Sequence, residues 1–102
     1  MSTKNAFYRR TFLNRPRHHL GAHVIADIAL ETPEAGRVWI DATVHLSDCS
    51  RHIDLDFSAD TAREASNALR KIRVLQAVLA DFEAALVLAQ AEAGLDVPTR
   101  RG

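Results

Sequence analysis

The stretch VWIDATVHLSDCSRHIDLDF, residues 38–57, decides the fold because apolar and polar residues alternate along almost its whole length. Successive residues of a strand point to opposite faces of a sheet, so this alternation predicts two strands, at residues 38–46 and 52–57. The SDCS segment between them is typical of a turn. One face of the predicted hairpin carries only apolar side chains, namely Val38, Ile40, Ala42, Val44, Leu46, Ile53, Leu55 and Phe57.

The segment HVIADIAL, residues 23–30, alternates in the same way and predicts a third strand. The connection ETPEAG, residues 31–36, holds a Pro and a Gly and no core residue, which indicates a hairpin loop. Residues 1–20 are basic and lose any regular period around Pro16. We expect this segment to form either an arm or an edge strand.

From Ser58 onward the apolar residues recur at intervals of three and four, which predicts a helix of about 35 residues. Thr61 and Glu64 have the spacing of a capping box, and Gly94 is a typical helix stop. The predicted class is therefore α+β, with a three-stranded antiparallel meander packed against one long C-terminal helix. A single β-β-β-α domain would span residues 21–94 and be followed by a flexible tail at 95–102.

The polar face of the predicted sheet would align equivalent residues directly opposite one another on neighbouring strands. A turn centred on SDCS and a loop at 31–36 give one row of His23, His45 and His52. A second row consists of Asp27, Asp41 and Asp56, with Asp54 between the two rows. Carboxylates placed directly opposite one another repel, so the second row needs cations or solvent screening.

Three neighbouring imidazoles are a weak candidate for zinc ligands, because catalytic zinc is commonly held by three protein ligands and a water. The spacing of His23, His45 and His52 matches no zinc signature, so we expect no metal and no other cofactor. Cys49 is the single cysteine, which excludes an intrachain disulfide. No base or oxyanion pocket can be assigned to accompany it as a nucleophile, and we do not expect an enzyme.

The formal net charge is zero, but the basic residues are concentrated at the N-terminus. Residues 1–26 carry five basic residues and no acid, which leaves 13 − 5 = 8 basic and all 13 acidic residues for the rest of the chain. The basic segment can fold back across the carboxylates, or it can meet an acidic partner. As an alternative function, Arg9 and Arg10 together with Arg63, Arg70, Lys71 and Arg73 of the helix would contact nucleic acid.

The second half of the predicted helix is apolar on more than one side, and the helix is too long for the sheet to cover. We therefore expect a homodimer whose interface contains Leu75, Val78, Leu79, Phe82 and Leu86. The function predicted is that of a small cytoplasmic interaction protein without enzymatic activity. Its partner-binding residues would be Trp39, Asp41, His45, His52 and Asp54 of the polar face, with Arg9 and Arg10 of the basic segment.

Overall fold

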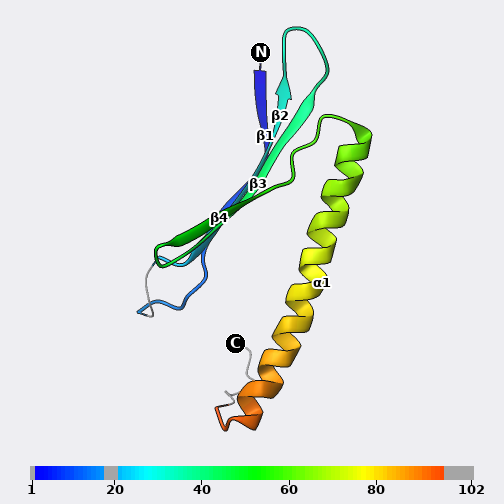
Figure 1. Ribbon diagram of the computed structural model, residues 1–102. Coiled ribbons are helices and arrows are strands. Elements are labelled where there is room, and N and C mark those ends of the chain that lie inside the picture. Colours follow the sequence, from blue (N-terminus) through cyan, green and yellow to red (C-terminus); the bar gives the residue numbers. More distant parts are fainter. Residues whose placement is uncertain (1, 18–20, 96–102) are drawn as a thin grey trace. The chain divides into compact units, whose positions relative to one another are not determined.

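The computed structural model describes residues 2–17 and 21–95, which form an antiparallel sheet followed by one helix (Figure 1). The four strands, hydrogen-bonded in chain order, are β1 (Ser2–Phe12), β2 (His23–Thr32), β3 (Trp39–Asp48) and β4 (Arg51–Asp56). The helix α1 spans Ala62–Glu92. The predicted α+β class and meander are thus confirmed, and the N-terminal segment contributes the edge strand rather than an arm. The predicted tail lies, beyond Leu95, outside the described residues.

The two predicted hairpin registers are each wrong by two residues. In the structure His45 pairs with Asp54 instead of His52, and with Ile25 instead of His23. In the β3–β4 hairpin, Asp48 pairs with Arg51, so two residues form the loop instead of four. In the β2–β3 hairpin, Glu31 pairs with Trp39 instead of lying in the predicted loop. A shift of two residues leaves every side chain on its predicted face, because the side chains of a strand alternate with a period of two.

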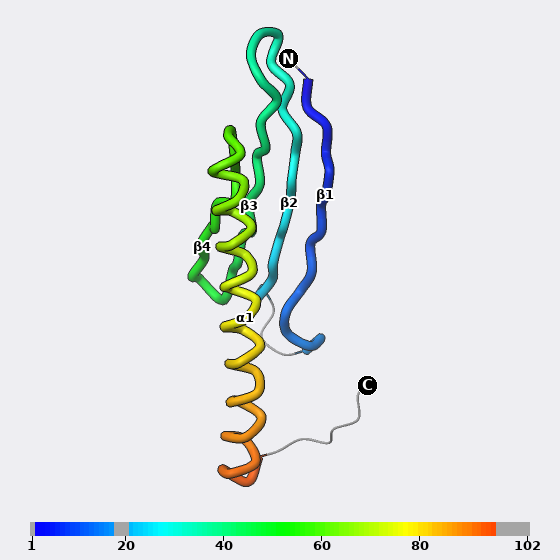
Figure 2. Tube along the Cα trace, turned by 90° about the vertical axis from the view of Figure 1, so that its right-hand side faces the viewer, coloured from blue at the N-terminus to red at the C-terminus, as the bar shows by residue number. Residues whose placement is uncertain are grey.

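Strand β1 runs along β2 over its whole length, as the tube in Figure 2 shows. Its pairing is interrupted by a bulge between Asn5 and Phe7, which places one extra residue on β1. All of its residues are exposed, since it forms an outer edge of the sheet. A bulge together with charged residues such as Lys4 is a common protection of an edge strand against pairing with another chain.

The helix begins later than predicted because residues 57–59 continue the pairing with β3. The Phe57 amide donates to the Ala42 carbonyl, and Ile40 and Ala59 exchange two backbone hydrogen bonds of 2.8 and 3.0 Å. The Ser58 side chain joins this extension, since its hydroxyl accepts from the Ala42 amide at 3.0 Å. Ser58 and Ala59 are therefore the end of the sheet and not the start of α1.

Both ends of α1 have the caps that the sequence predicts. The Glu64 amide donates to Thr61 Oγ1 at 3.1 Å, and Glu64 Oε1 accepts from the Asp60 amide at 2.7 Å. At the other end Gly94 adopts a φ of 77°, and the Leu95 amide donates to the Gln90 carbonyl at 2.7 Å. With the 3.1 Å bond from Gly94 to Ala91 this forms a Schellman motif. No helix in the described part of the chain is both long and apolar enough to cross a bilayer.

Only three residues of the described chain are buried, and all three are alanines: Ala22, Ala42 and Ala59. The larger apolar side chains are half-buried or exposed, including Ile28 and Ile53 on the apolar face of the sheet. The chain divides into two compact units, Met1–Arg70 and Lys71–Gly102. The predicted packing of the helix against the sheet stays a prediction.

Candidate functional site

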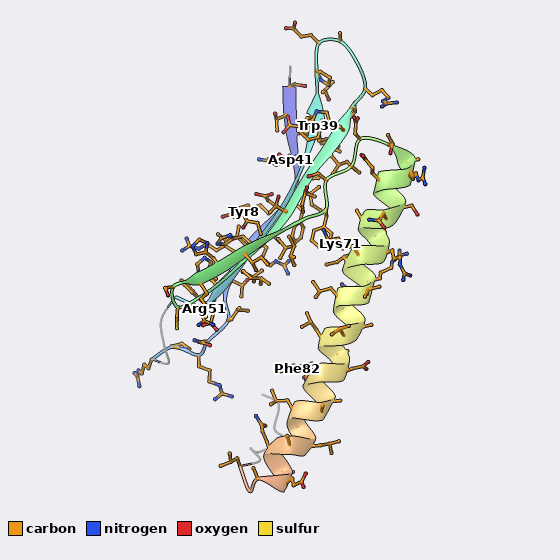
Figure 3. The ribbon with its side chains drawn as sticks, viewed as in Figure 1. Tyr8, Trp39, Asp41, Arg51, Lys71 and Phe82 are labelled. Atoms are coloured by element: carbon orange, nitrogen blue, oxygen red, sulfur yellow. The ribbon has the colours of Figure 1, made fainter. Side chains whose placement is uncertain are left out.

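The candidate site is the polar face of the sheet, which the observed pairing defines strand by strand. Alternation along each strand brings these side chains to one side, and Figure 3 labels Tyr8, Trp39 and Asp41 among them. The face consists of Thr3, Asn5, Tyr8, Arg10 and Phe12 from β1, His23, Ile25, Asp27, Ala29 and Glu31 from β2, Trp39, Asp41, Thr43, His45 and Ser47 from β3, and His52, Asp54 and Asp56 from β4.

Four rings form a continuous series of contacts across this face. The centroids of His23 and His45 are 5.8 Å apart, and those of His45 and His52 are 5.9 Å apart. The ring of Phe12 on β1 meets His23 edge-on at 6.3 Å. The three histidines are therefore brought together as predicted, but as diagonal neighbours rather than as a row of direct cross-strand partners.

The middle imidazole of the series is held by a carboxylate. His45 Nδ1 is hydrogen-bonded to Asp54 Oδ1, its direct partner across β3 and β4. His23 Nδ1 is similarly paired with the Gly21 carbonyl at 2.5 Å, and this bond requires that Nδ1 of His23 carries the proton. Each of these two rings thus has one nitrogen committed to a partner within the protein.

The zinc hypothesis receives no support from this arrangement. Among residues 2–17 and 21–95, no group of three or more His, Cys, Asp or Glu side chains is placed to hold a metal ion. The ring contacts join the histidines in a line from β2 to β4, with the outer two on either side of His45. Cys49 is exposed at the tip of the β3–β4 turn.

The predicted carboxylate row is also wrong, because the observed register separates its members. Thr43 lies between Asp27 and Asp56 and pairs with both of them. Asp41 pairs with Ala29 instead, and its Oδ1 accepts a 3.4 Å hydrogen bond from the Ser58 hydroxyl. Asp56 Oδ1 accepts from the Ser58 amide at 3.0 Å. The carboxylates are spread over the face, so their mutual repulsion is smaller than in a direct row.

The N-terminal cations are divided between the two faces of the sheet. Arg10 lies on the polar face with its guanidinium 5.6 Å from the centre of the Phe12 ring. Arg9 lies on the opposite face, over Phe7 at 5.5 Å. Within the described strands, Arg10 is therefore the cation that accompanies the carboxylates of Asp27, Glu31, Asp41, Asp54 and Asp56. A continuous basic surface for nucleic acid is not formed by Arg9 and Arg10 together.

The structure adds residues that the sequence did not single out. Tyr8 on β1 is 64 % exposed and pairs with Asp27, and Ser58 bonds the carboxylates of Asp41 and Asp56. Tyr8 could not be assigned to this face from the sequence because the pairing of β1 with β2 was not predicted. Ser58 was missed because it follows β4 in an extension of the sheet that the alternation does not indicate. Trp39, predicted to be a partner-binding residue, is half-buried opposite Glu31.

Comparison with known proteins gives no relative from which a role could be inferred: no family model, no curated protein and no solved structure matches the chain. The polar face presents a series of rings, exposed at Phe12 and His52 and half-buried at His23 and His45, beside dispersed carboxylates. This arrangement is suited to contacts with cationic and aromatic groups.

Proposed function

We propose that this protein is a homodimeric interaction module without enzymatic activity, which binds a partner protein through the polar face of its sheet. The single observation that carries the proposal is the exposure of α1, in which no residue is buried. Leu79 is 55 % exposed and Leu88 is 71 % exposed. These residues are nine positions apart, which at 100° per residue places them on opposite sides of the helix.

A helix with large apolar side chains on opposite sides needs more than one covering surface. Full burial of a Leu or Phe side chain contributes about 1.5–3 kcal/mol. Leaving Leu79, Phe82 and Leu86 in water therefore forgoes several kcal/mol per chain, a large fraction of the stability of an ordinary domain. The same helix of a second copy presents a matching apolar surface, and symmetric dimers are the commonest soluble oligomers.

The partner-binding surface is the polar face, with Trp39, Asp41, His45, His52, Asp54 and Arg10 as its contact residues. The Asp54 side chain is 66 % exposed. Its neighbours His52 and Asp56 on β4 are exposed, whereas those on β3 are half-buried. Catalysis generally requires a concave site that excludes water, whereas an open face with an aromatic anchor is typical of protein recognition. The excess of carboxylates over Arg10 favours a partner with Lys or Arg residues. We place this function in the cytoplasm.

The dimer is tested by sedimentation equilibrium of the wild type and of Leu79→Asp. The wild type is expected to sediment as a dimer, and Leu79→Asp should raise the dissociation constant by at least about tenfold because it places a charge in the interface. Ala77→Asp is the matched control, since it adds the same charge to an exposed position on the other side of α1. A wild type that stays monomeric at high concentration contradicts the proposal.

The binding face is tested by affinity capture from the native host, with captured proteins identified by mass spectrometry. Trp39→Ala should lose a specific set of basic proteins that the wild type retains, because a large aromatic contact is removed from the face. Val38→Ala is the control, since Val38 precedes Trp39 and is itself exposed. Identical sets for the two variants would place the binding surface elsewhere.

A further inference from the structure

The residues of α1 that would meet a second copy form a regular seam. Between Ile72 and Ala89, six of the apolar residues are separated by intervals of three, four, three, four and three: Ile72, Leu75, Leu79, Phe82, Leu86 and Ala89. This is the repeat of a coiled coil, in which the mean interval of 3.5 residues keeps the seam facing a partner helix. The whole seam lies within the second compact unit.

Much of this seam is open to contact. Leu79, Phe82 and Leu86 are exposed at the middle of the seam, and Phe82 is the most exposed of the three at 62 %. Figure 3 labels Phe82 on α1. Ile72 and Leu75 are half-buried. The side chains with the most area to lose from water are thus at the centre of the 72–89 segment. A pairing that is symmetric about this centre buries them most completely.

Two identical helices can pair in a parallel or an antiparallel direction, and the residues beside the seam distinguish these directions. In a parallel pair, Val78 of each copy lies beside Glu83 of the other, which sets a carboxylate against an apolar side chain. In an antiparallel pair centred between Leu79 and Phe82, Val78 lies beside Ala85 and Gln76 beside Glu83. The same antiparallel alignment sets Lys71 of each copy near Glu92 of the other, which joins opposite charges at both ends.

We propose that α1 pairs with the α1 of a second copy in this antiparallel register, with Ile72 opposite Ala89, Leu75 opposite Leu86, and Leu79 opposite Phe82. The inference rests on the homodimer proposed above and specifies its geometry. Each Phe82 then meets a Leu79 of the other copy, so that two large rings are not forced against each other at the centre. The two Lys71 and Glu92 pairs fix the alignment of the ends.

Disulfide trapping tests the register, with Cys49→Ser as the background so that introduced thiols are the only ones. The antiparallel register places Ile72 next to Ala89 of the other copy, whereas the two Ile72 residues are separated by 17 helical positions, about 25 Å. A disulfide requires Cα atoms within about 7 Å. A mixture of Ile72→Cys and Ala89→Cys proteins should therefore form a covalent heterodimer under mild oxidation, and neither protein should cross-link with itself.

The outcomes separate this inference from the proposal on which it rests. Cross-linking of Ile72→Cys with itself would show a parallel pair. This result contradicts the antiparallel register but agrees with the proposed homodimer. A dimer in sedimentation with no cross-link in any mixture likewise overturns the register. A monomer in sedimentation overturns both. Ala77→Cys and Ala84→Cys are the matched controls, because they lie on the side of the helix away from the seam and should not cross-link.

A charge exchange provides a second test that does not depend on new thiols. Lys71→Glu should weaken self-association by about fivefold, because it places two carboxylates together at each end of the pair. Adding Glu92→Lys to the same chain should restore the wild-type dissociation constant. A Lys71→Glu protein that is weakened but not rescued by Glu92→Lys contradicts the antiparallel alignment, since its defect then arises from other contacts of Lys71.

Discussion

Cys49 shows how one backbone angle at the β3–β4 turn affects stability. Its φ is 57°, a left-handed conformation that costs a residue with a Cβ atom about 1–2 kcal/mol. Cys49→Gly should therefore raise the free energy of unfolding by about 0.5–1 kcal/mol in urea titrations followed by circular dichroism, since the lower strain exceeds the added chain entropy of glycine. Ser50→Gly, at a neighbouring position without a positive φ, should lower it. An equal effect of both substitutions would show that the strain at Cys49 is not significant.

The loops of the two hairpins explain why the predicted pairings of individual residues were wrong while their faces were right. Alternation fixes which face a side chain occupies, but it does not distinguish registers that differ by two residues. The register is set by the loop of each hairpin: Asp48 and Arg51 close a turn of two residues between β3 and β4, and Glu31 pairs with Trp39 at the end of the β2–β3 hairpin. The prediction that the three histidines lie together was still correct, because His45 is a diagonal neighbour of both His23 and His52. The predicted row of carboxylates was wrong, because it required that the aspartates pair directly across the strands.

The N-terminal cap of α1 is the feature of a single element that can be tested most directly. Thr61 Oγ1 accepts from the Glu64 amide, one of the helical N–H groups that have no backbone partner. Thr61→Ala should lower the free energy of unfolding by about 1 kcal/mol, measured by urea titration at fixed protein concentration. Thr61→Ser keeps the hydroxyl and should stay within a few tenths of the wild-type value. If the alanine variant matched the serine variant, the cap would contribute nothing.

Helix ends could be predicted from the sequence where they depend on residue types at a fixed spacing. The capping pair of Thr61 and Glu64 and the stop at Gly94 were visible as residue types at fixed spacings, and both are formed. The sequence left the start of α1 open because Ser58 also resembles a cap, whereas its hydroxyl bonds to Ala42 of β3. The edge strand β1 was left open between two forms because residues 7–12 do not alternate: Arg9 lies on the apolar face of the sheet and Phe12 on the polar face.

For the whole molecule, stability should depend on protein concentration. The three buried residues of the described chain are alanines, which bring little apolar area out of water. If folding is completed by association of two copies, each tenfold increase in concentration adds about 1.4 kcal/mol to the stability of the dimer. For two chains of this length the midpoint of thermal unfolding should then rise by about 3–4 °C per tenfold. Calorimetry over a hundredfold range measures this, with Leu79→Asp expected to unfold at a lower temperature that is independent of concentration. A wild-type midpoint that stays constant over that range would mean that the chain completes its core alone.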